Sequence, residues 1–153
     1  MKGTNPSGAI HPTIFLILWF AVGFGLERVM PLELPGATAL APLTVVLFLA
    51  GGVLFVWSAL ELRRSGTTTE HGQPTTVLVT DGPYAFSRHP IYLALVCILL
   101  GLAIRSASVW FVMVTAVFWI AVQWFTVRKE DAYLASQFPE PYARYKGSVR
   151  QWI

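Results

Sequence analysis

Long apolar stretches constrain this chain more than any other feature of its 153 residues. There are four of them, over residues 9–26, 39–60, 90–104 and 109–127. A helix needs roughly 17–25 apolar residues to cross the hydrocarbon core of a bilayer, and three of the stretches reach that length. The third is shorter and spans only with help from flanking polar residues, for example by snorkelling of Arg105. We therefore expect one all-α domain over residues 1–153, a polytopic membrane protein of about four transmembrane helices.

The composition supports a membrane environment. Hydrophobic residues make up 55% and charged residues 12% of the chain, whereas soluble domains carry about 25% charged residues. A single cysteine, Cys97, excludes an intrachain disulfide. The net charge of +3 favours anionic lipid headgroups over nucleic acid as a partner. The first stretch is not expected to be a cleaved signal, because His11-Pro12 interrupts its start and Glu27-Arg28 follows it.

The basic residues predict the orientation of the spans. An even number of spans places both termini and the middle loop on one side of the membrane. That side carries nine of the eleven basic residues: Lys2, Arg63, Arg64, Arg88, Arg128, Lys129, Arg144, Lys146 and Arg150. The other side carries only Arg28 and Arg105. The positive-inside rule then places the termini and the polar segments in the cytoplasm.

Two polar segments make up the predicted cytoplasmic face. Residues 61–89 form a long loop, in which 75–80 has strand-like character without a partner and Asp81-Gly82-Pro83 forms a turn. Residues 128–153 continue the fourth helix until Pro139 and Pro141 break it. Beyond that break, aromatic and basic residues alternate in the manner of an interfacial anchor: Tyr142, Arg144, Tyr145, Lys146, Arg150 and Trp152.

The first candidate site lies at the start of the third stretch. Pro90 suits the first position of a helix, which places Arg88 and His89 beside the unpaired N–H groups of that helix. Tyr92 follows His89 by three residues and shares its face. Such an arrangement suits a carboxylate or a phosphate. The alternative is that Arg88 meets lipid phosphate, His89 only caps the helix and Tyr92 belongs to the interfacial belt.

The second candidate site is the acidic pair Glu130-Asp131. On a helix these side chains point about 100° apart, so we expect one to face inward and the other to pair with a base, for example Asp131 with Arg128. The alternative is a solvated helix end.

Three other features carry structural expectations. Gln123 favours a hydrogen bond between helices over a place in a cavity, and Gly51-Gly52 favours close helix packing. A metal site is not expected, since no ligands stand at metal spacing from His11 or His71.

The two candidate sites together resemble one known family. Residues 66–152 are similar to the isoprenylcysteine carboxyl methyltransferase-like family, a relative of the phospholipid N-methyltransferases. The matching pieces are Gly66-Thr67-Thr68, the turn at 78–84, Arg88-His89-Pro90-Ile91-Tyr92, the segment 130–134 and the tail from Phe138 through Tyr142 to Tyr145. The chain departs from the family pattern at Ala94 and Pro139, where glycine is usual, and at Asp131, where glutamate is usual. The first two spans carry no matching motif.

The resemblance implies methyl transfer from S-adenosylmethionine. The cofactor pocket would face the cytoplasm between the loop before the third helix and the C-terminal helix. Arg88, His89, Tyr92 and Glu130 would bind the cofactor, with Tyr84, Asp131 and Tyr133 as second candidates. Arg88 and Glu130 would also serve the reaction, and Arg128 or Arg144 would neutralise a carboxylate acceptor. A prenylcysteine-type carboxylate, a phospholipid amine, a thiol and a lipophilic metabolite all remain open as acceptors.

Two alternatives stand beside this expectation. Membrane sterol reductases share a similar cytoplasmic end and use NADPH, although they are much longer, and no additional phosphate-binding basic residues are evident in this chain. A non-enzymatic membrane subunit would bind a partner or anionic lipid through its loop and tail, and it would bind no cofactor. The sequence leaves the oligomeric state open.

Overall fold

The computed structural model describes residues 12–66 and 77–153. Within this part of the chain the secondary structure is helical, apart from an isolated bridge between Glu33 and Ser108. The α-helices are α1 (Pro12–Val29), α2 (Ala41–Arg64), α3 (Pro90–Arg105), α4 (Val109–Ala121), α5 (Arg128–Gln137) and α6 (Pro139–Ser148). A 3-10 helix, η1 (Gly82–Ala85), precedes α3, and a π-helix, η2 (Val122–Val127), joins α4 to α5. The predicted all-α class is confirmed.

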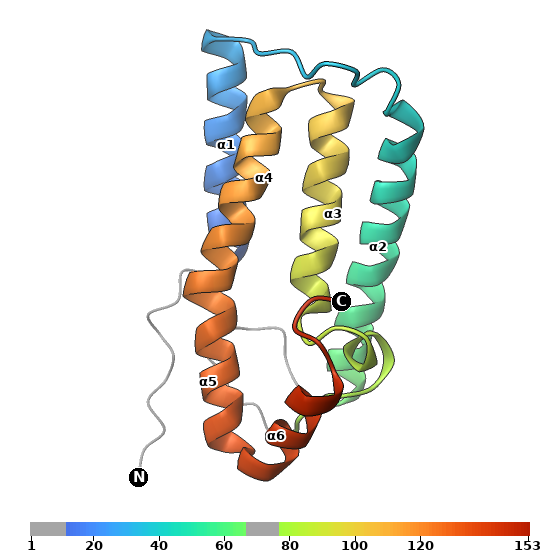
Figure 1. The fold of residues 1–153 in the computed structure, drawn as a ribbon, viewed down its shortest axis with the longest axis vertical. Coiled ribbons are helices and arrows are strands. Elements are labelled where there is room, and N and C mark those ends of the chain that lie inside the picture. Colours follow the sequence, from blue (N-terminus) through green and yellow to red (C-terminus); the bar gives the residue numbers. More distant parts are fainter. Residues whose placement is uncertain (1–11, 67–76) are drawn as a thin grey trace.

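The long helices run side by side (Figure 1). α1 packs against α4, α4 against α3, and α3 against α2. α4, η2 and α5 form one continuous helical segment that extends beyond the other helices, and α6 folds back against α5. One end of the bundle, which we call the polar end, therefore contains four segments: α5, α6, residues 149–153 and the loop that precedes α3.

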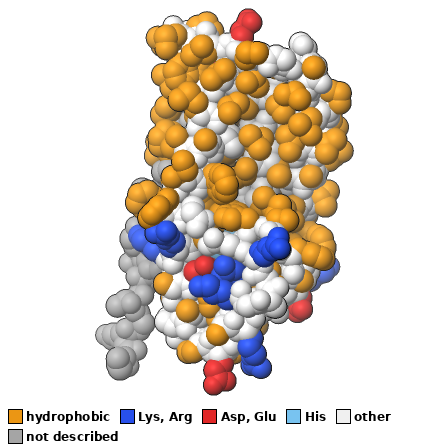
Figure 2. Space-filling view, viewed as in Figure 1, with side chains coloured by type: hydrophobic (Ala, Val, Ile, Leu, Met, Phe, Trp, Pro, Cys, Tyr) orange, Lys and Arg blue, Asp and Glu red, His pale blue; other side chains and the backbone are white. Residues whose placement is uncertain are grey.

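Apolar side chains cover the outside of the bundle. Leu49 and Val53 on α2 are both 64% exposed, and Ile120 on α4 is 57% exposed. Figure 2 shows this apolar surface above a polar end that carries the visible clusters of Lys, Arg, Asp and Glu. Within the described residues, two helical segments are long and apolar enough to cross a membrane, Ala41–Arg64 and Val109–Gln137, and Pro90–Arg105 is a shorter apolar helix.

Glycines on both helices allow close contact between α2 and α3. A Cβ atom at Gly101 on α3 would lie 3.2 Å from the ring of Phe48 on α2, and the contact is tighter still at Gly51 on α2. A Cβ atom at Gly51 would lie 2.8 Å from the carbonyl oxygen of Ala94 and 2.8 Å from Cγ1 of Ile98. A Cβ atom at Gly52 would meet nothing within 4 Å. The predicted close packing is thus confirmed for Gly51 and is wrong for Gly52.

The end opposite the polar end is closed by a tight connection from α3 to α4. Ala107 takes a positive φ of 49° in this turn. The Ser108 hydroxyl donates a hydrogen bond to the Glu27 carboxylate, and the Trp110 indole donates one to the Met30 carbonyl at 2.7 Å. These bonds tie the end of α1 to the start of α4.

Some predicted boundaries need correction. The second apolar stretch continues as a helix to Arg64, because a helix is not bound to end where its apolar residues end. The strand-like residues 77–80 form no strand, while 75 and 76, like residues 9–11 of the first stretch, lie outside the described residues. Pro139 separates α5 from α6, but Pro141 does not break a helix. It lies in the first turn of α6, where a backbone N–H has no partner within the helix.

Candidate functional site

The loop before α3 carries Arg88 and His89 into the interior of the polar end. Gly82 begins η1 with a φ of +60°, and Pro90 begins α3, as predicted. The Arg88 side chain is 8% exposed and that of His89 is 2% exposed. This burial contradicts the alternative in which Arg88 reaches out to lipid phosphate.

Asp131 on α5 is the centre of the buried polar cluster. Its Oδ2 lies 3.0 Å from Nη1 of Arg88, and its Oδ1 lies 3.0 Å from Nε2 of His89. The Tyr142 hydroxyl on α6 donates to Oδ1 of Asp131 and accepts from Nη1 of Arg88 at 2.9 Å. We call Arg88, His89, Asp131 and Tyr142 the polar cluster. The expectation that Asp131 pairs with Arg128 is wrong, because its carboxylate is paired with Arg88 and His89 of the loop before α3.

The polar cluster holds opposite charges in a dry setting. Burial alone lowers the pKa of His89, but its hydrogen bond to Asp131 and the nearby Glu130 carboxylate outweigh this and raise the pKa to about 9. Burial alone raises the pKa of Asp131, but its bonds to His89 and Tyr142 and the charge of Arg88 hold it at about 2. His89 is therefore protonated and Asp131 ionised at neutral pH.

Glu130 lies on the other side of His89. Its Oε2 is 3.6 Å from Nδ1 of His89, a distance longer than a hydrogen bond, and its carboxylate hydrogen-bonds to Tyr92. The rings of His89 and Tyr92 are 6.0 Å apart between centroids. The predicted set Arg88, His89, Tyr92 and Glu130 is thus brought together, with Asp131 at its centre.

Among the described residues, buried polar atoms of this set are left without a hydrogen-bond partner. They are Nε of Arg88, Nδ1 of His89 and Oε2 of Glu130. A buried polar atom without a partner costs free energy, so such atoms are expected to meet a ligand or water. Two of these atoms, Nδ1 of His89 and Oε2 of Glu130, lie 3.6 Å apart, and the third is a further buried donor of the polar cluster.

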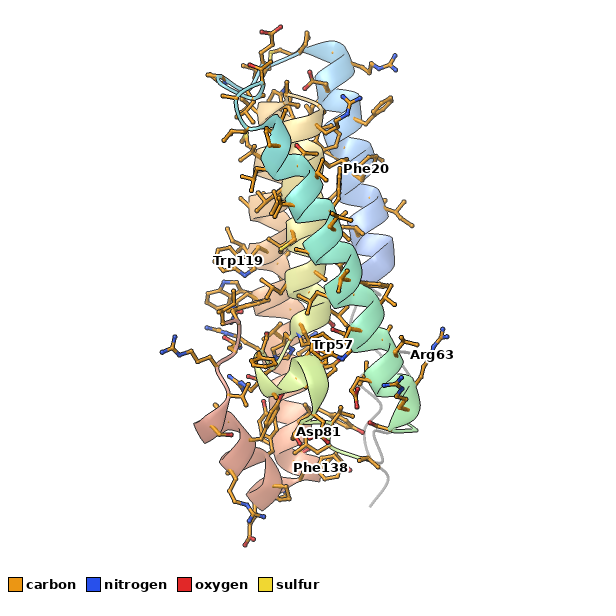
Figure 3. All side chains as sticks on the ribbon, turned by 90° about the vertical axis from the view of Figure 1, so that its right-hand side faces the viewer. Phe20, Trp57, Arg63, Asp81, Trp119 and Phe138 are labelled. Atoms are coloured by element: carbon orange, nitrogen blue, oxygen red, sulfur yellow. The ribbon has the colours of Figure 1, made fainter. Side chains whose placement is uncertain are left out.

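The end of α2 adds residues that the sequence motifs do not include. A Cβ atom at Gly82 would lie 3.1 Å from Oε2 of Glu61 and 3.2 Å from Nε1 of Trp57. Figure 3 shows Trp57 beside the loop before α3. The charges of Glu130 and Glu61 both raise the pKa of Tyr84, after the larger effect of its burial. Glu61 could have been identified from the sequence, because it is an acidic residue in the last turns of an otherwise apolar helix.

The tyrosines of α6 face inward. Tyr142 is 2% exposed and Tyr145 is 7% exposed, and the Tyr145 hydroxyl donates to the carbonyl oxygen of Tyr84 at 2.7 Å. The expectation that they anchor the chain at the membrane interface is therefore wrong for both. Burial of these rings holds α6 against the loop before α3.

Other predicted site residues lie outside the polar cluster. The Arg128 guanidinium stacks over the Trp124 ring, 3.7 Å from its centroid. Tyr133 follows Asp131 by two residues, about 200° around α5, so its side chain leaves the helix on the opposite side. Gln123 binds residues 151 and 152 rather than another helix of the bundle, which corrects the expected bond between helices.

A cavity of about 430 Å³ opens between α5 and α6 beside the polar cluster. Its lining includes Asp131 and Tyr142, together with the basic Arg128 and Lys146. Small side chains form much of the rest, at Ala132, Ala135 and Ala143. The cavity therefore borders the polar cluster at Asp131 and Tyr142, whereas Arg88, His89 and Glu130 are not among its lining residues.

An all-helical bundle with an apolar surface, which carries a buried ion-pair cluster at one end, defines a membrane protein with a polar site at its edge. The profile of the phospholipid methyltransferase family matches residues 41–141 of this chain. The chain belongs to that family.

Curated relatives cover a smaller part of the chain. A cobalt-zinc-cadmium resistance protein, CzcN, of Cupriavidus metallidurans is 43% identical over 48% of this chain and 34% of its own length. A nickel-cobalt-cadmium resistance protein, NccN, of Alcaligenes xylosoxydans xylosoxydans is 35% identical over 48% of this chain and 35% of its own length. An uncharacterized protein of Haemophilus influenzae is 34% identical over 41% of this chain and 100% of its own length. The chain thus spans about a third of the length of the two metal-resistance proteins. No solved structure matches it.

Proposed function

We propose that this protein is an integral-membrane methyltransferase that uses S-adenosylmethionine and methylates a lipophilic or membrane-accessible acceptor. The observation that supports this proposal most is the polar cluster with its neighbour Glu130, because it sets unsatisfied donors and an acceptor at the edge of an apolar bundle. Family membership supplies the reaction class, and the cluster supplies residues suited to the cofactor.

The residues present fit the amino-acid part of S-adenosylmethionine. Nε of Arg88 and Nδ1 of the protonated His89 are buried donors that suit a carboxylate. The Glu130 carboxylate suits an ammonium or a ribose hydroxyl. Tyr84 and Tyr92 suit an apolar ring, whereas Tyr133 points to the other side of α5 and suits it less. When bound, the cofactor supplies an electrophilic methyl group.

The protein's own contribution to the reaction is position and exclusion of water. Asp131 holds the cationic side chains of Arg88 and His89, and the Tyr142 hydroxyl on α6 bonds to both Asp131 and Arg88. A carboxylate or thiolate acceptor needs no strong base. An amine acceptor needs a group that takes up its proton, and the carboxylates of Glu130 and Glu61 near the site are the candidates. Asp131 is a poorer candidate, because its oxygens already accept hydrogen bonds from Arg88, His89 and Tyr142.

The acceptor would arrive from the membrane. We place the helices α1 to α4 as four spans, with the polar end in the cytoplasm, since nine of eleven basic residues fall on that side. A carboxylate acceptor would find a second cation at Arg128 or Lys146 in the wall of the cavity. A prenylcysteine-type carboxylate, a phospholipid amine and a thiol are the acceptor classes to test.

Calorimetric titration of the purified protein with S-adenosylhomocysteine and with NADPH tests the proposal. We expect binding of S-adenosylhomocysteine only. Binding of NADPH alone would instead support a reductase, and binding of neither would support a non-enzymatic subunit. Methyl transfer from labelled S-adenosylmethionine into a lipid extract, a prenylcysteine analogue and a small thiol then identifies the acceptor.

Variants test the residue assignment. Glu130→Gln and His89→Ala should each weaken binding of S-adenosylhomocysteine by about tenfold or more, the effect of one lost charge-assisted hydrogen bond. Glu140→Gln makes the same chemical change at an exposed acid of α6 and should bind normally. If the two site variants remain folded in detergent and bind with the affinity of the wild type, the assignment is wrong.

A further inference from the structure

Residues 149–152 return from α6 to the polar cluster, and we call them the return segment. The backbone N–H of Arg88 donates to the carbonyl oxygen of Arg150 at 3.1 Å. The Ser87 hydroxyl donates to the carbonyl oxygen of Gln151 at 3.3 Å. The return segment is therefore bonded along the loop that carries Arg88 and His89.

The Gln151 side chain connects the π-helix to the centre of the polar cluster. Its Oε1 accepts a hydrogen bond from Nε2 of Gln123 at 3.2 Å, and its Nε2 donates to Oδ2 of Asp131 at 3.4 Å. Oε1 of Gln123 accepts from the Trp152 indole at 3.1 Å. Both ends of both amides are therefore used, in one chain of bonds from Trp152 to Asp131.

The π-helix makes this chain of bonds possible. In a regular α-helix, Gln123 and Asp131 would be separated by about 80° around the axis, since they are eight residues apart. The i→i+5 bonds of η2 put more residues into each turn and so reduce that angle. Gln123 and Asp131 thereby come to one side of the helix, where a single side chain, Gln151, reaches both.

Trp152 covers the same region from the apolar side. Its ring centroid lies 6.2 Å from that of His89 and 6.0 Å from that of Trp119, whose ring is 48% exposed. Trp152 also packs against the apolar core that includes Tyr92 and Phe118. The return segment thus separates the charged His89 from the surface that faces lipid.

We propose that Gln123 and Gln151 are positioning residues of the methyl-transfer site, which orient the Asp131 carboxylate and through it Arg88 and His89. This inference rests on the proposed function, because Arg88 and His89 are the groups assigned to the cofactor. An apolar residue at 123 would suit the bilayer without the cost of placing an amide beside it, so the bonded amides are better explained by the geometry that they impose.

The variant Gln151→Glu tests the positioning role, because a merely structural role would not make the affinity for S-adenosylhomocysteine depend on pH. At pH 8 the introduced carboxylate repels Asp131, and binding of S-adenosylhomocysteine should weaken by about tenfold. At pH 5 the introduced carboxyl group, when protonated beside Asp131, donates in place of the amide and should restore most of that affinity. Gln151→Ala should bind weakly at both pH values.

The titratable groups that face position 151 are expected to keep their charge states between pH 5 and pH 8. Asp131 on α5 stays ionised because its pKa is about 2, and His89 stays protonated at pH 8 because its pKa is about 9. The Arg88 guanidinium also faces Asp131, and Tyr142 on α6 stays neutral because burial and Asp131 raise its pKa. Only the introduced carboxyl group is expected to titrate next to Asp131 between pH 5 and pH 8.

Gln137→Glu is the matched control, because it makes the same change at an exposed position at the end of α5. Its affinity for S-adenosylhomocysteine should equal that of the wild type at both pH values. If Gln151→Ala and Gln151→Glu both bind S-adenosylhomocysteine with the affinity of the wild type at pH 5 and at pH 8, the positioning role is wrong and the proposed function stands. If the folded wild type binds no S-adenosylhomocysteine, both proposals fail.

Discussion

At the scale of single residues, Gly82 meets two requirements: a positive φ and no side chain against the end of α2. Its φ of +60° is strained for any other residue, and a Cβ atom there would press on Glu61 and Trp57. Gly82→Ala should therefore lower the free energy of unfolding by about 1–2 kcal/mol or more and should weaken binding of S-adenosylhomocysteine. Thermal unfolding in detergent and calorimetry measure the two effects.

Gly36→Ala is the control for Gly82→Ala, because Gly36 has a φ of +74° and open space around its Cβ position. It should show a similar loss of stability and unchanged binding. Equal binding by the two variants would argue against a role of the end of α2 in the site.

The pair of His89 and Asp131 should make stability depend on pH in a defined window. The pKa of His89 is raised from 6.5 to about 9, so its contribution is complete below pH 6.5 and is lost as the pH rises through 9. The pKa of Asp131 is lowered from 3.8 to about 2, so its contribution is complete above pH 3.8 and is lost as the pH falls through 2. The thermal midpoint should be highest between about pH 4 and pH 6.5.

Asp131→Asn should remove most of this dependence above pH 6.5. It leaves Arg88 and His89 without their charged partner, and we expect a loss of about 3 kcal/mol near pH 6, at the low end for a broken buried pair. Asp81→Asn changes an exposed aspartate and should retain the profile of the wild type. Melting curves from pH 4 to pH 10 measure this, and an unchanged slope in Asp131→Asn would contradict the assigned coupling.

At the scale of elements, Gly51 and Gly52 form a natural matched pair on α2. Gly51→Ala should separate α2 from α3 and lower the melting temperature, because Ala94 and Ile98 leave no room for a methyl group. Gly52→Ala should be neutral or should stabilise by up to about 1 kcal/mol, since alanine favours a helix. A greater loss of stability in Gly52→Ala than in Gly51→Ala would mean that the two helices pack on another face.

The apolar stretches predicted the helices, and Pro90 predicted the start of α3 and the place of Arg88 and His89 beside it, because hydrophobic length and a proline at a helix start act locally. The partner of Asp131 could not be predicted in this way. Whether Arg128 or Arg88 reaches it depends on how the loop before α3 packs against α5. Gln151 and Glu61 were missed for the same reason, since a π-helix and a close glycine contact bring them to the site from distant parts of the chain.

At the scale of the whole molecule, the distribution of basic residues predicts which end faces the cytoplasm. Ser136 lies at the polar end and Ser106 at the opposite end, and both are exposed. In a Cys97→Ser background, Ser106→Cys should react with a membrane-impermeant maleimide in intact spheroplasts, whereas Ser136→Cys should react only after lysis. The charge difference of nine against two basic residues is the physical reason. The reverse pattern would place the polar cluster outside the cytoplasm, away from a cytoplasmic supply of S-adenosylmethionine, and equal labelling of both positions in intact spheroplasts would contradict an odd number of membrane crossings between them.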